Sequence, residues 1–501
     1  MKKSAAILVL AFIFPFLLTL YSCDKPKEKN LILVDNIKID KESNLQNVYN
    51  SLIGSLIFSP LLFRYNSGAA EHHVLVEDIK VLPGNKVIEV KLKDGVRLHD
   101  GKPLTADDVI RSIDRLKVEL NNETLKEVKG ESIDRQRFRL TSNYPIPDAN
   151  NLLSTISVFP SHSSLFNGTG PFRFKRWVDN GVELEANNDY FEGAPKLKKI
   201  TYLYEPDERK RLTILLKGEA DLLAGISPDT ARFLENDVRF NVHKDHEGFY
   251  AALFLNNKSP LFSDKRVRKA VSMAVDRNSI IEKGLDDGGV SISSPFPPEL
   301  LSPISETGSQ GYDPKEAVRI LQNAGWKDRD GDGILEKDGK KLSFTIYYPR
   351  EFEELKRIAD IIGQQLFEAG IGMESATVDK KEIGNISGDY DGILFLAAYD
   401  EHFNLNRWLS TTPTNEYGNL SLYGNKEVDA LLGQLQKSGS AEEKNIIYGR
   451  LREIFYEDVP AAFLYAPLNY LAVSRKFRGA DKLEFHVYSF YRIKDWEMEG
   501  R

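Results

Sequence analysis

The chain contains a single cysteine, Cys23, so no internal disulfide can hold its fold together. A fold built from this chain therefore has to be stabilised by buried apolar side chains. Cys23 lies shortly after a basic start, Met1–Lys3, and an apolar run of 16 residues from Ala5 to Leu20. A basic segment followed by an apolar segment is the pattern of a secretory signal peptide. The run is short for a membrane span, which needs roughly 18 or more apolar residues.

The residues around Cys23 resemble the acylation site of bacterial lipoproteins. A small residue directly precedes the cysteine in Leu20-Tyr21-Ser22, although Tyr21 is bulkier than is usual at its position. We expect residues 1–22 to be removed and Cys23 to carry the lipid, with an incidental thiol in an ordinary signal sequence as the alternative. The segment 23–30 is charged and contains a proline, as expected of a tether.

Removing 22 of the 501 residues leaves 479, which is too long for one core and predicts two or three domains. The removal takes away two lysines and no acidic residue, so the formal net charge changes from −7 to −9. This charge, together with the lack of a long basic run, argues against a nucleic-acid partner. We expect a monomer outside the cytoplasm that is soluble apart from its membrane anchor.

Helix and strand patterns alternate along the rest of the chain. Residues 87–93 alternate apolar and polar side chains, as a half-buried strand does. Thr105 and Asp108 form a capping pattern, and Asp313 followed by Pro314 is another strong helix start. The other expected helices begin at or near Asp207, Asp264 and Ser440. This mixture predicts an α/β or α+β protein with several lobes.

Five sequence blocks together resemble one protein family. Val96–Val109 resembles the signature of the extracellular solute-binding proteins of the oligopeptide, dipeptide and nickel class, the family 5 type. The other four blocks, in the family's order, are Gly168–Phe172, Asn187–Pro195, Asp264–Ala270 and Tyr312–Trp326. Each block is weak by itself, but five in order over nearly the whole mature chain are specific.

The resemblance implies an α/β protein with the two-lobed periplasmic-binding-protein fold. In this fold two lobes close over a ligand about a hinge, and this class has an extra inserted domain. The resemblance assigns lobe I to 30–45, 165–262 and 470–501, the inserted domain to 46–164 and lobe II to 263–469.

The resemblance also implies where a peptide would bind. Peptide-binding members often use an aspartate of the second lobe to meet the free amine of the peptide. The corresponding position here is Asp400, with Glu401 as the alternative, because Ala397 stands where the family often has a tryptophan. The neighbouring side chains are either pocket lining, with Arg407 available for a ligand carboxylate, or an aromatic patch packed within the lobe. They are Tyr399, His402, Phe403, Arg407 and Trp408.

Metal and catalytic patterns are weak. Asp328–Gly333 resembles the start of a calcium loop, but Gly339 stands where that loop needs a glutamate, so a hairpin turn is favoured. The adjacent His72 and His73 would point to opposite faces of a strand, and the other close pair is His243 with His246. The chain has no motif of a zinc protease, a serine hydrolase or a phosphate-binding loop. We therefore predict no cofactor, no resident metal and no enzymatic activity.

The functional expectation follows from the resemblance. It implies a lipid-anchored receptor, in the periplasm or at the cell surface, that captures a peptide or a related small solute for the permease of an ABC importer. Two alternatives stay open. The first is a sensor or adhesion lipoprotein without a permease, and the second is a carrier of nickel or a metal chelate.

Overall fold

The computed structural model describes most of the chain that follows the predicted tether. The described residues are 30–64, 71–120, 122, 125–143, 146, 149–159, 165–246, 248–296, 311–386, 390–398, 409–411, 419–435, 441–483 and 489–498. The predicted signal peptide, Cys23 and the tether up to residue 29 lie outside them. Within these ranges no helix combines the length and the apolar character that crossing a bilayer requires.

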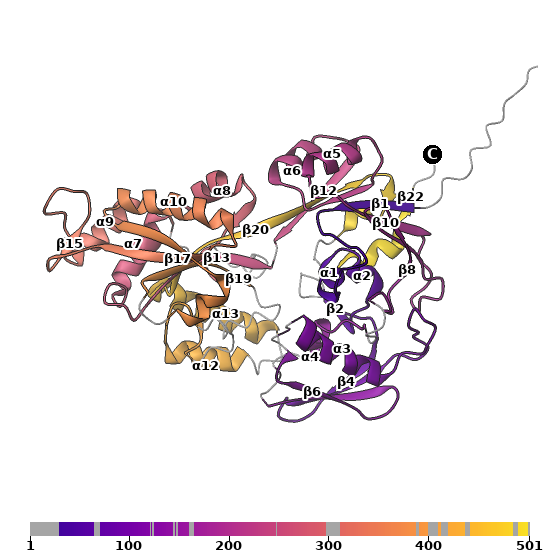
Figure 1. Cartoon of the computed structure of the whole chain (residues 1–501). Coiled ribbons are helices and arrows are strands. Elements are labelled where there is room, and N and C mark those ends of the chain that lie inside the picture. The colour runs from indigo at the N-terminus through magenta and orange to yellow at the C-terminus, as the bar shows by residue number, and fades with distance from the viewer. Residues whose placement is uncertain are drawn as a thin grey trace, which may run out of the picture.

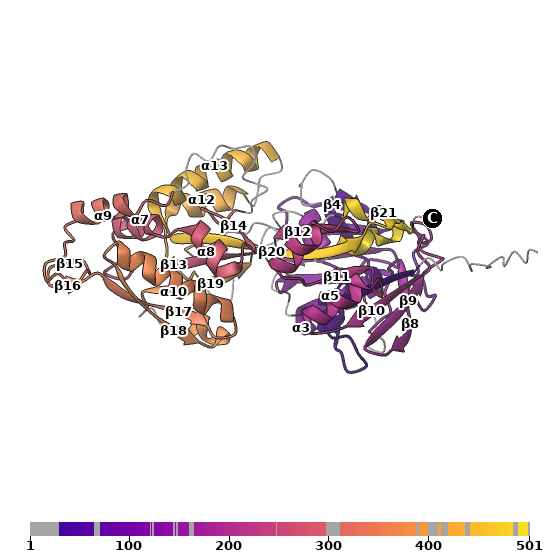
Figure 2. The same ribbon diagram turned by 90° about the horizontal axis from the view of Figure 1, so that it is seen from above.

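One long strand, β20 (Ala461–Ser474), passes through both lobes of the molecule (Figure 1). In lobe I its C-terminal part pairs with β11 (Leu222–Ala224) and β12 (Phe240–His246). In lobe II its N-terminal part pairs with β13 (Phe249–Leu255) and β14 (Gly289–Ser291). All of these strands belong to one sheet of 12 strands. Seen from above, the two lobes lie on either side of the middle of β20 (Figure 2).

The sheet of lobe I is built around β1 (Asn30–Asp35). This strand is parallel to both β10 (Lys199–Tyr204) and β11, and its side chains Leu31, Leu33 and Val34 are wholly buried. The sheet continues antiparallel through β9 (Gly181–Ala186) to β8 (Phe172–Val178).

Helices cover both faces of the lobe I sheet. On one face, α5 (Glu208–Leu216) and α6 (Pro228–Glu235) enclose a cluster that contains Val34, Leu223 and Ala472. The other face packs against α1 (Leu45–Asn50), α2 (Gly54–Ile57) and the inserted domain in one continuous core.

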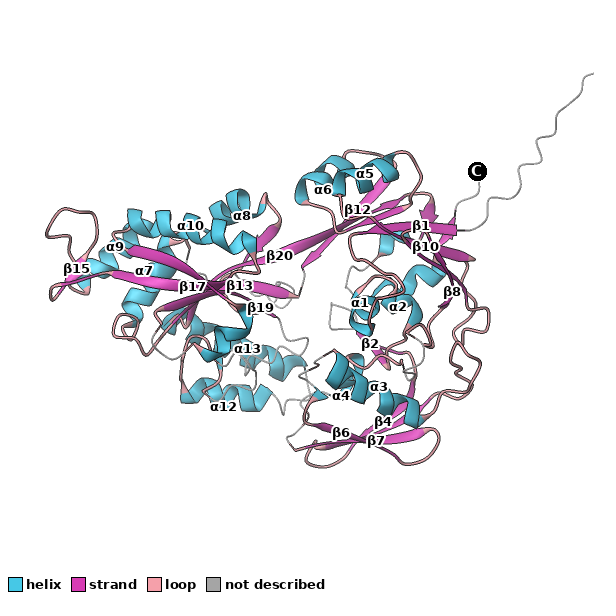
Figure 3. Cartoon of the chain, in the orientation of Figure 1, coloured by secondary structure: helices cyan, strands magenta, loops and turns pink. Residues whose placement is uncertain are grey.

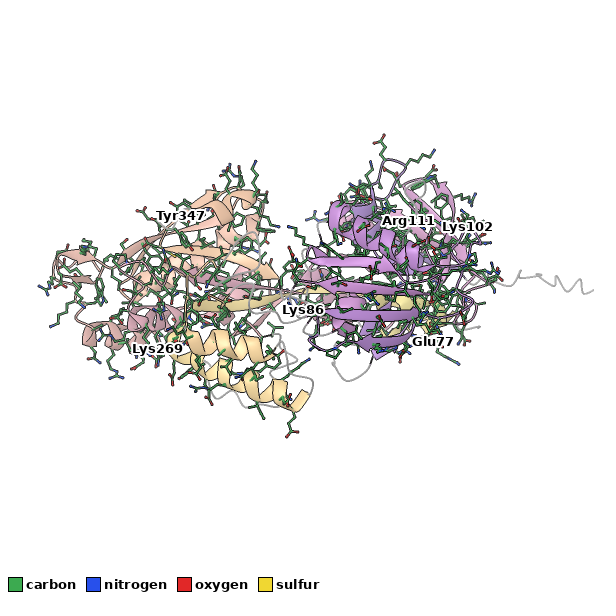
Figure 4. The ribbon with its side chains drawn as sticks, turned by 90° about the horizontal axis from the view of Figure 1, so that it is seen from below. Glu77, Lys86, Lys102, Arg111, Lys269 and Tyr347 are labelled. Atoms are coloured by element: carbon green, nitrogen blue, oxygen red, sulfur yellow. The ribbon has the colours of Figure 1, made fainter. Side chains whose placement is uncertain are left out.

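The inserted domain has its own antiparallel sheet of four strands, β4-β5-β7-β6. The capping pattern predicted before α3 (Ala106–Glu119) is confirmed, because the Thr105 amide donates to the Asp108 carboxylate at 2.8 Å. The elements of this domain are β2 (Leu62–Arg64), β3 (Glu71–His73), β4 (Val76–Val81), β5 (Val87–Leu92), α3, β6 (Val128–Ser132), β7 (Arg137–Ser142) and α4 (Ala149–Ser154). Figure 4 shows Glu77, Lys86, Lys102 and Arg111 on the side of the molecule that carries this domain.

The sheet of lobe II has the order β18-β17-β19-β13-β20. Here β17 (Ser343–Pro349) is parallel to both β18 (Gly372–Val378) and β19 (Gly392–Ala398), and β13 is antiparallel to β19. β13 lies between β19 and β20, and its residues 250–255 are buried, as expected of a central strand in a sheet that is covered on both faces.

Helices also cover both faces of the lobe II sheet (Figure 3). One face carries α7 (Lys265–Ala274), α8 (Arg277–Leu285), α9 (Pro314–Asn323) and α10 (Glu353–Glu368), and the other carries α12 (Lys426–Leu435) and α13 (Ala441–Asp458). The expected helix starts at Asp264 and Asp313 are confirmed, since each carboxylate accepts a backbone amide of the first turn. The remaining elements are short: β15 (Glu336–Lys337), β16 (Lys340–Lys341), β21 (Phe477–Arg478), β22 (Glu497–Met498), and the 3-10 helices η3 (Lys380–Asn385), η4 (Ala480–Lys482) and η5 (Ser489–Asp495).

Candidate functional site

The parallel strands of both lobes end at the junction between the lobes. In lobe I, Ala224 at the end of β11 pairs with Leu471, on the side of β20 that leads to lobe II. In lobe II, Ala398 at the end of β19 pairs with Phe249, the first residue of β13. The carboxyl ends of parallel strands are where ligands bind in open α/β sheets, so both lobes direct such an edge at the junction.

Among the described residues, two chain crossings join the lobes at this junction. One is β20, which continues without a break through Ala466, Pro467 and Leu468. The other is the connection from β12 to β13, which passes through Gly248 at a φ of +75°, a backbone conformation that glycine adopts at little cost. A connection limited to two crossings leaves the lobes free to rotate relative to one another.

The predicted binding residues follow directly after β19. Tyr399, Asp400, Glu401, His402, Phe403, Arg407 and Trp408 lie outside the described residues, so their roles stay predictions. The structure does place the two sides of this segment. Ala397 is wholly buried beneath α12 and α13, and Leu409 is wholly buried in the same cluster. The described residues on either side of the segment therefore belong to the α12 and α13 side of the lobe II sheet.

A buried polar cluster lies at the end of β1, and the sequence analysis missed it. The carboxylate of Asp35 accepts the Asn36 amide at 2.7 Å and lies 3.0 Å from the hydroxyl of Tyr202. The same hydroxyl lies 2.6 Å from the carbonyl of Ile37. Burial raises the pKa of the Asp35 carboxyl, although the Asn36 amide, Tyr202 and Arg211 oppose the shift. The cluster fixes the backbone where β1 ends. The only sequence signal for it is an aspartate at the end of an apolar strand.

Arg211 ties together two strand ends of lobe I at the junction. Its side chain is buried, and Nη1 donates to the carbonyls of Glu205 at 2.8 Å and Pro206 at 2.9 Å. Nη2 donates to the carbonyl of Gly225 at 2.8 Å. Glu205 follows β10 and Gly225 follows β11, so one guanidinium group holds the two loops in a fixed position.

Arg277 has the same role in lobe II. Its Nε donates to the carbonyls of Phe463 at 2.6 Å and Ile292 at 3.2 Å, and Nη2 donates to the hydroxyl of Ser272 at 2.9 Å. Burial lowers the pKa of Arg277 to about 10, so the group stays charged at neutral pH. It joins α8 to β20 close to the point where β20 leaves lobe II. Arg211 therefore fixes the loops after β10 and β11 in lobe I, and Arg277 fixes α8 against β20 in lobe II. We call these parts of the two lobes, which face the junction, the rims.

The three aspartates of the calcium-like sequence pattern form a turn. Asp328, Asp330 and Asp332 are exposed and close together. They lie on a hairpin turn between Lys327 and Glu336, as predicted, where the Asp328 carboxylate accepts the Gly331 amide at 2.8 Å.

The two histidine pairs lie on different strands, β3 and β12. His72 Nε2 lies 2.7 Å from the carboxylate of Glu192, so it links the inserted domain to lobe I. His243 lies on β12, and the side chain of His246 is outside the described part of the structure.

Comparison with known proteins agrees with this architecture. Residues 72–418 match the family described as bacterial extracellular solute-binding proteins, family 5 middle. The oligopeptide-binding protein AppA of Bacillus subtilis (strain 168) is 31% identical over 467 residues, which cover 84% of this chain and 82% of that protein. The nickel-binding protein NikA of Staphylococcus aureus is 24% identical over 431 residues, which cover 80% of this chain and 82% of that protein.

A solved structure supports the same comparison. The oligopeptide-binding protein AppA from Bacillus subtilis, in complex with a nonapeptide, has a TM-score of 0.69 at 27% identity. The alignment covers 94% of this chain and 99% of that one. The fold is therefore that of the two-lobed periplasmic binding proteins.

Proposed function

Because the chain belongs to the bacterial extracellular solute-binding proteins of family 5, we propose that it captures a small solute between its lobes for an ABC importer. The observation that carries this proposal is the convergence of strand carboxyl ends from both lobes on one junction. In the described part of the chain, β20 and the β12–β13 connection cross this junction. A ligand that contacts both rims binds the closed form better than the open form and shifts the population toward it. The closed complex is then the form that docks on the permease.

The proposed solute is a peptide. Support comes from the oligopeptide-binding relative at 31% identity and from its structural counterpart, which holds a nonapeptide. Asp400 is proposed to pair with the free amine, with Glu401 as the alternative, and Arg407 with the terminal carboxylate. Main-chain hydrogen bonds would accept many sequences, as in strand addition. The remaining proposed pocket-lining residues are Tyr399, His402, Phe403 and Trp408.

Nickel or a metal chelate is a second candidate solute. The similarity to the nickel-binding protein NikA extends over 80% of this chain and favours it. Such a solute would use the same junction, because the fold and the two rims do not change with the ligand.

The location and the anchor of the receptor are also proposals. A lipid on Cys23 would hold the receptor at the outer side of a membrane, and several acyl chains on one residue suffice for stable anchoring. A monomer would leave both lobes free to meet the permease. A sensor or adhesion protein without a permease is the rival, and a permease gene beside the receptor gene would argue against it.

The strand pairing supports revised moving units. We place lobe I at residues 30–45, 165–246 and 468–498, and lobe II at residues 249–466. The inserted domain at 46–164 shares one continuous core with lobe I. We therefore expect these two parts to move as one body when the receptor closes.

The first experiment is native mass spectrometry of the mature protein purified without added ligand. Denaturing the sample then releases any bound molecule for identification. Recovery of short peptides supports the peptide assignment, and recovery of nickel supports the second candidate. A protein that arrives empty and binds neither peptides nor nickel in calorimetry contradicts both.

A further inference from the structure

Lobe I and lobe II touch directly beside β20. Arg232 on α6 of lobe I donates from Nη1 to the carbonyl of Asp286 at 3.0 Å, and the same nitrogen lies 3.3 Å from the carboxylate of Asp287. Pro228, at the start of α6, packs closely on Gly288. A Cβ added at Gly288 would lie 2.6 Å from the Cγ of Pro228. We name these five residues the rear contact.

The lobe II side of the rear contact is a fixed turn. Asp286 and Asp287 both have left-handed backbones, with φ of +51° and +65°. Arg357 on α10 lies 3.5 Å from the carboxylate of Asp286 and donates to the last turn of α8. The amide of Leu468 on β20 donates to the carbonyl of Gly288 at 3.0 Å. The turn is therefore attached to α10 and to the strand that crosses between the lobes, so it can transmit a force from α6.

The rear contact lies on the opposite face of the sheet from α12 and α13, the helices that cover the described residues on either side of the predicted binding segment. Ala397 and Leu409, on either side of that segment, are buried beneath α12 and α13. The side chains of α6 and α8 belong to the clusters on the other face. Figure 1 shows α6 and α8 together on one side of β20, with α12, α13 and the inserted domain on the other.

We infer that the rear contact is a strut that favours the open form of the receptor. A rotation about β20 that closes the binding face must separate α6 from the 286–288 turn on the opposite face. Closure therefore breaks the bonds from Arg232 to Asp286 and Asp287, and the ligand has to compensate for them. This inference rests on the proposed function, because it assumes a receptor that closes over its solute.

The expected effect of the strut is modest, and its sign is opposite to that of a ligand contact. Arg232 and Asp287 have side chains that are 47% and 62% exposed, so their ion pair contributes weakly. Removing it raises the fraction of closed protein, and the apparent dissociation constant falls by about 1.5- to 5-fold. A residue that touched the ligand would raise that constant on substitution.

The binding test uses Asp287→Asn, Arg232→Gln and the double variant in the full chain. Asparagine tolerates the left-handed backbone at position 287 and removes only the charge. Calorimetry with one fixed pool of random-sequence nonapeptides should give a lower apparent dissociation constant for each single variant than for the unsubstituted protein. The double variant should show no further decrease. The control is Arg319→Gln, which breaks the exposed Arg319–Glu316 pair at 2.6 Å within α9 and should leave the affinity unchanged. Weaker or unchanged binding by both single variants overturns the strut.

A second measurement needs no ligand and so separates the strut from the proposed function. Spin labels replace Val118 and Asn445, one in the inserted domain and one in lobe II, in a Cys23→Ser background that leaves no other thiol. Pulsed electron paramagnetic resonance should show more of the short interlobe distance in Arg232→Glu than in the unsubstituted protein. An unchanged distance distribution overturns the strut. If the unsubstituted protein binds no peptide, the peptide assignment fails, and this measurement alone decides the strut.

Discussion

His99 Nε2 donates to the carbonyl of Gly170 at 3.0 Å and thereby joins the inserted domain to lobe I. The amide of Gly168 lies 3.4 Å from Nδ1 and donates a hydrogen bond to it when the imidazole ring is neutral. His99 belongs to the first sequence block that resembles the family, and the two glycines belong to the second. Two of the sequence blocks that resemble the family therefore meet at the contact between the inserted domain and lobe I.

The stability of the protein should decrease in mild acid because of His99. Burial lowers the pKa of this imidazole in the folded protein, while the unfolded chain has the ordinary value of about 6.5. The stabilisation from the neutral ring is complete above pH ~6.5 and is lost as the pH falls from there through the folded pKa. Urea unfolding at pH 7.5 and pH 5.0 measures this loss. His99→Gln should show a smaller difference between the two values, and an equal difference would contradict this assignment.

Asp35 should tolerate replacement by asparagine but not by alanine. Asp35→Asn keeps an acceptor for the Asn36 amide and supplies a donor for the Tyr202 oxygen, so the free energy of unfolding at pH 7 should not fall. Asp35→Ala leaves the Asn36 amide without its acceptor and leaves Tyr202 with only the Ile37 carbonyl, so it should cost about 1–3 kcal/mol. The raised pKa of Asp35 means that the charged form is disfavoured in the fold, so its penalty is present at pH 7 and disappears in acid. Equal stability of the two variants in urea would show that the cluster is unimportant.

Arg211 should be a main support of the lobe I rim. Arg211→Ala removes the buried donor that three partly buried carbonyl groups share and should lower the free energy of unfolding by about 1–3 kcal/mol. Arg211→Lys keeps the charge but not the planar fork, so we expect an intermediate loss. The neighbouring exposed residue provides the control, since Arg209→Ala should change stability by less than about 0.5 kcal/mol. Chemical unfolding followed by circular dichroism measures all three variants.

The role of Asp400 can be tested with a double-mutant cycle. If its carboxylate pairs with the free amine of a peptide, Asp400→Asn should weaken binding by about 1.5–3 kcal/mol, or roughly 10- to 150-fold. N-terminal acetylation of the peptide removes the same charge, so the two changes should not add. Calorimetry with one nonapeptide in both forms completes the cycle. Additive losses would exclude this pairing, and the same cycle on Glu401 then tests the alternative.

Much of the local structure could be predicted from the sequence because it depends on neighbours along the chain. The helices after Thr105, Asp264 and Asp313 begin where predicted, since a capping side chain reaches amides only two or three residues away. The hairpin at Asp328 follows the same logic. The family resemblance gave the two-lobed fold, because the order of short scaffold blocks is visible without coordinates.

The tertiary structure decided which distant parts meet. The neighbours of an apolar strand such as β13 cannot be read from its sequence, and the structure shows that they are β19 and β20. Asp35 finds Tyr202 across 167 positions, and Arg232 finds Asp287 across 55. No local pattern marks such pairs, because their energy depends on burial and on chain crossings far away in sequence. The sequence by itself determined the family and the segments, whereas the rims and the rear contact exist only once the two lobes are placed on β20.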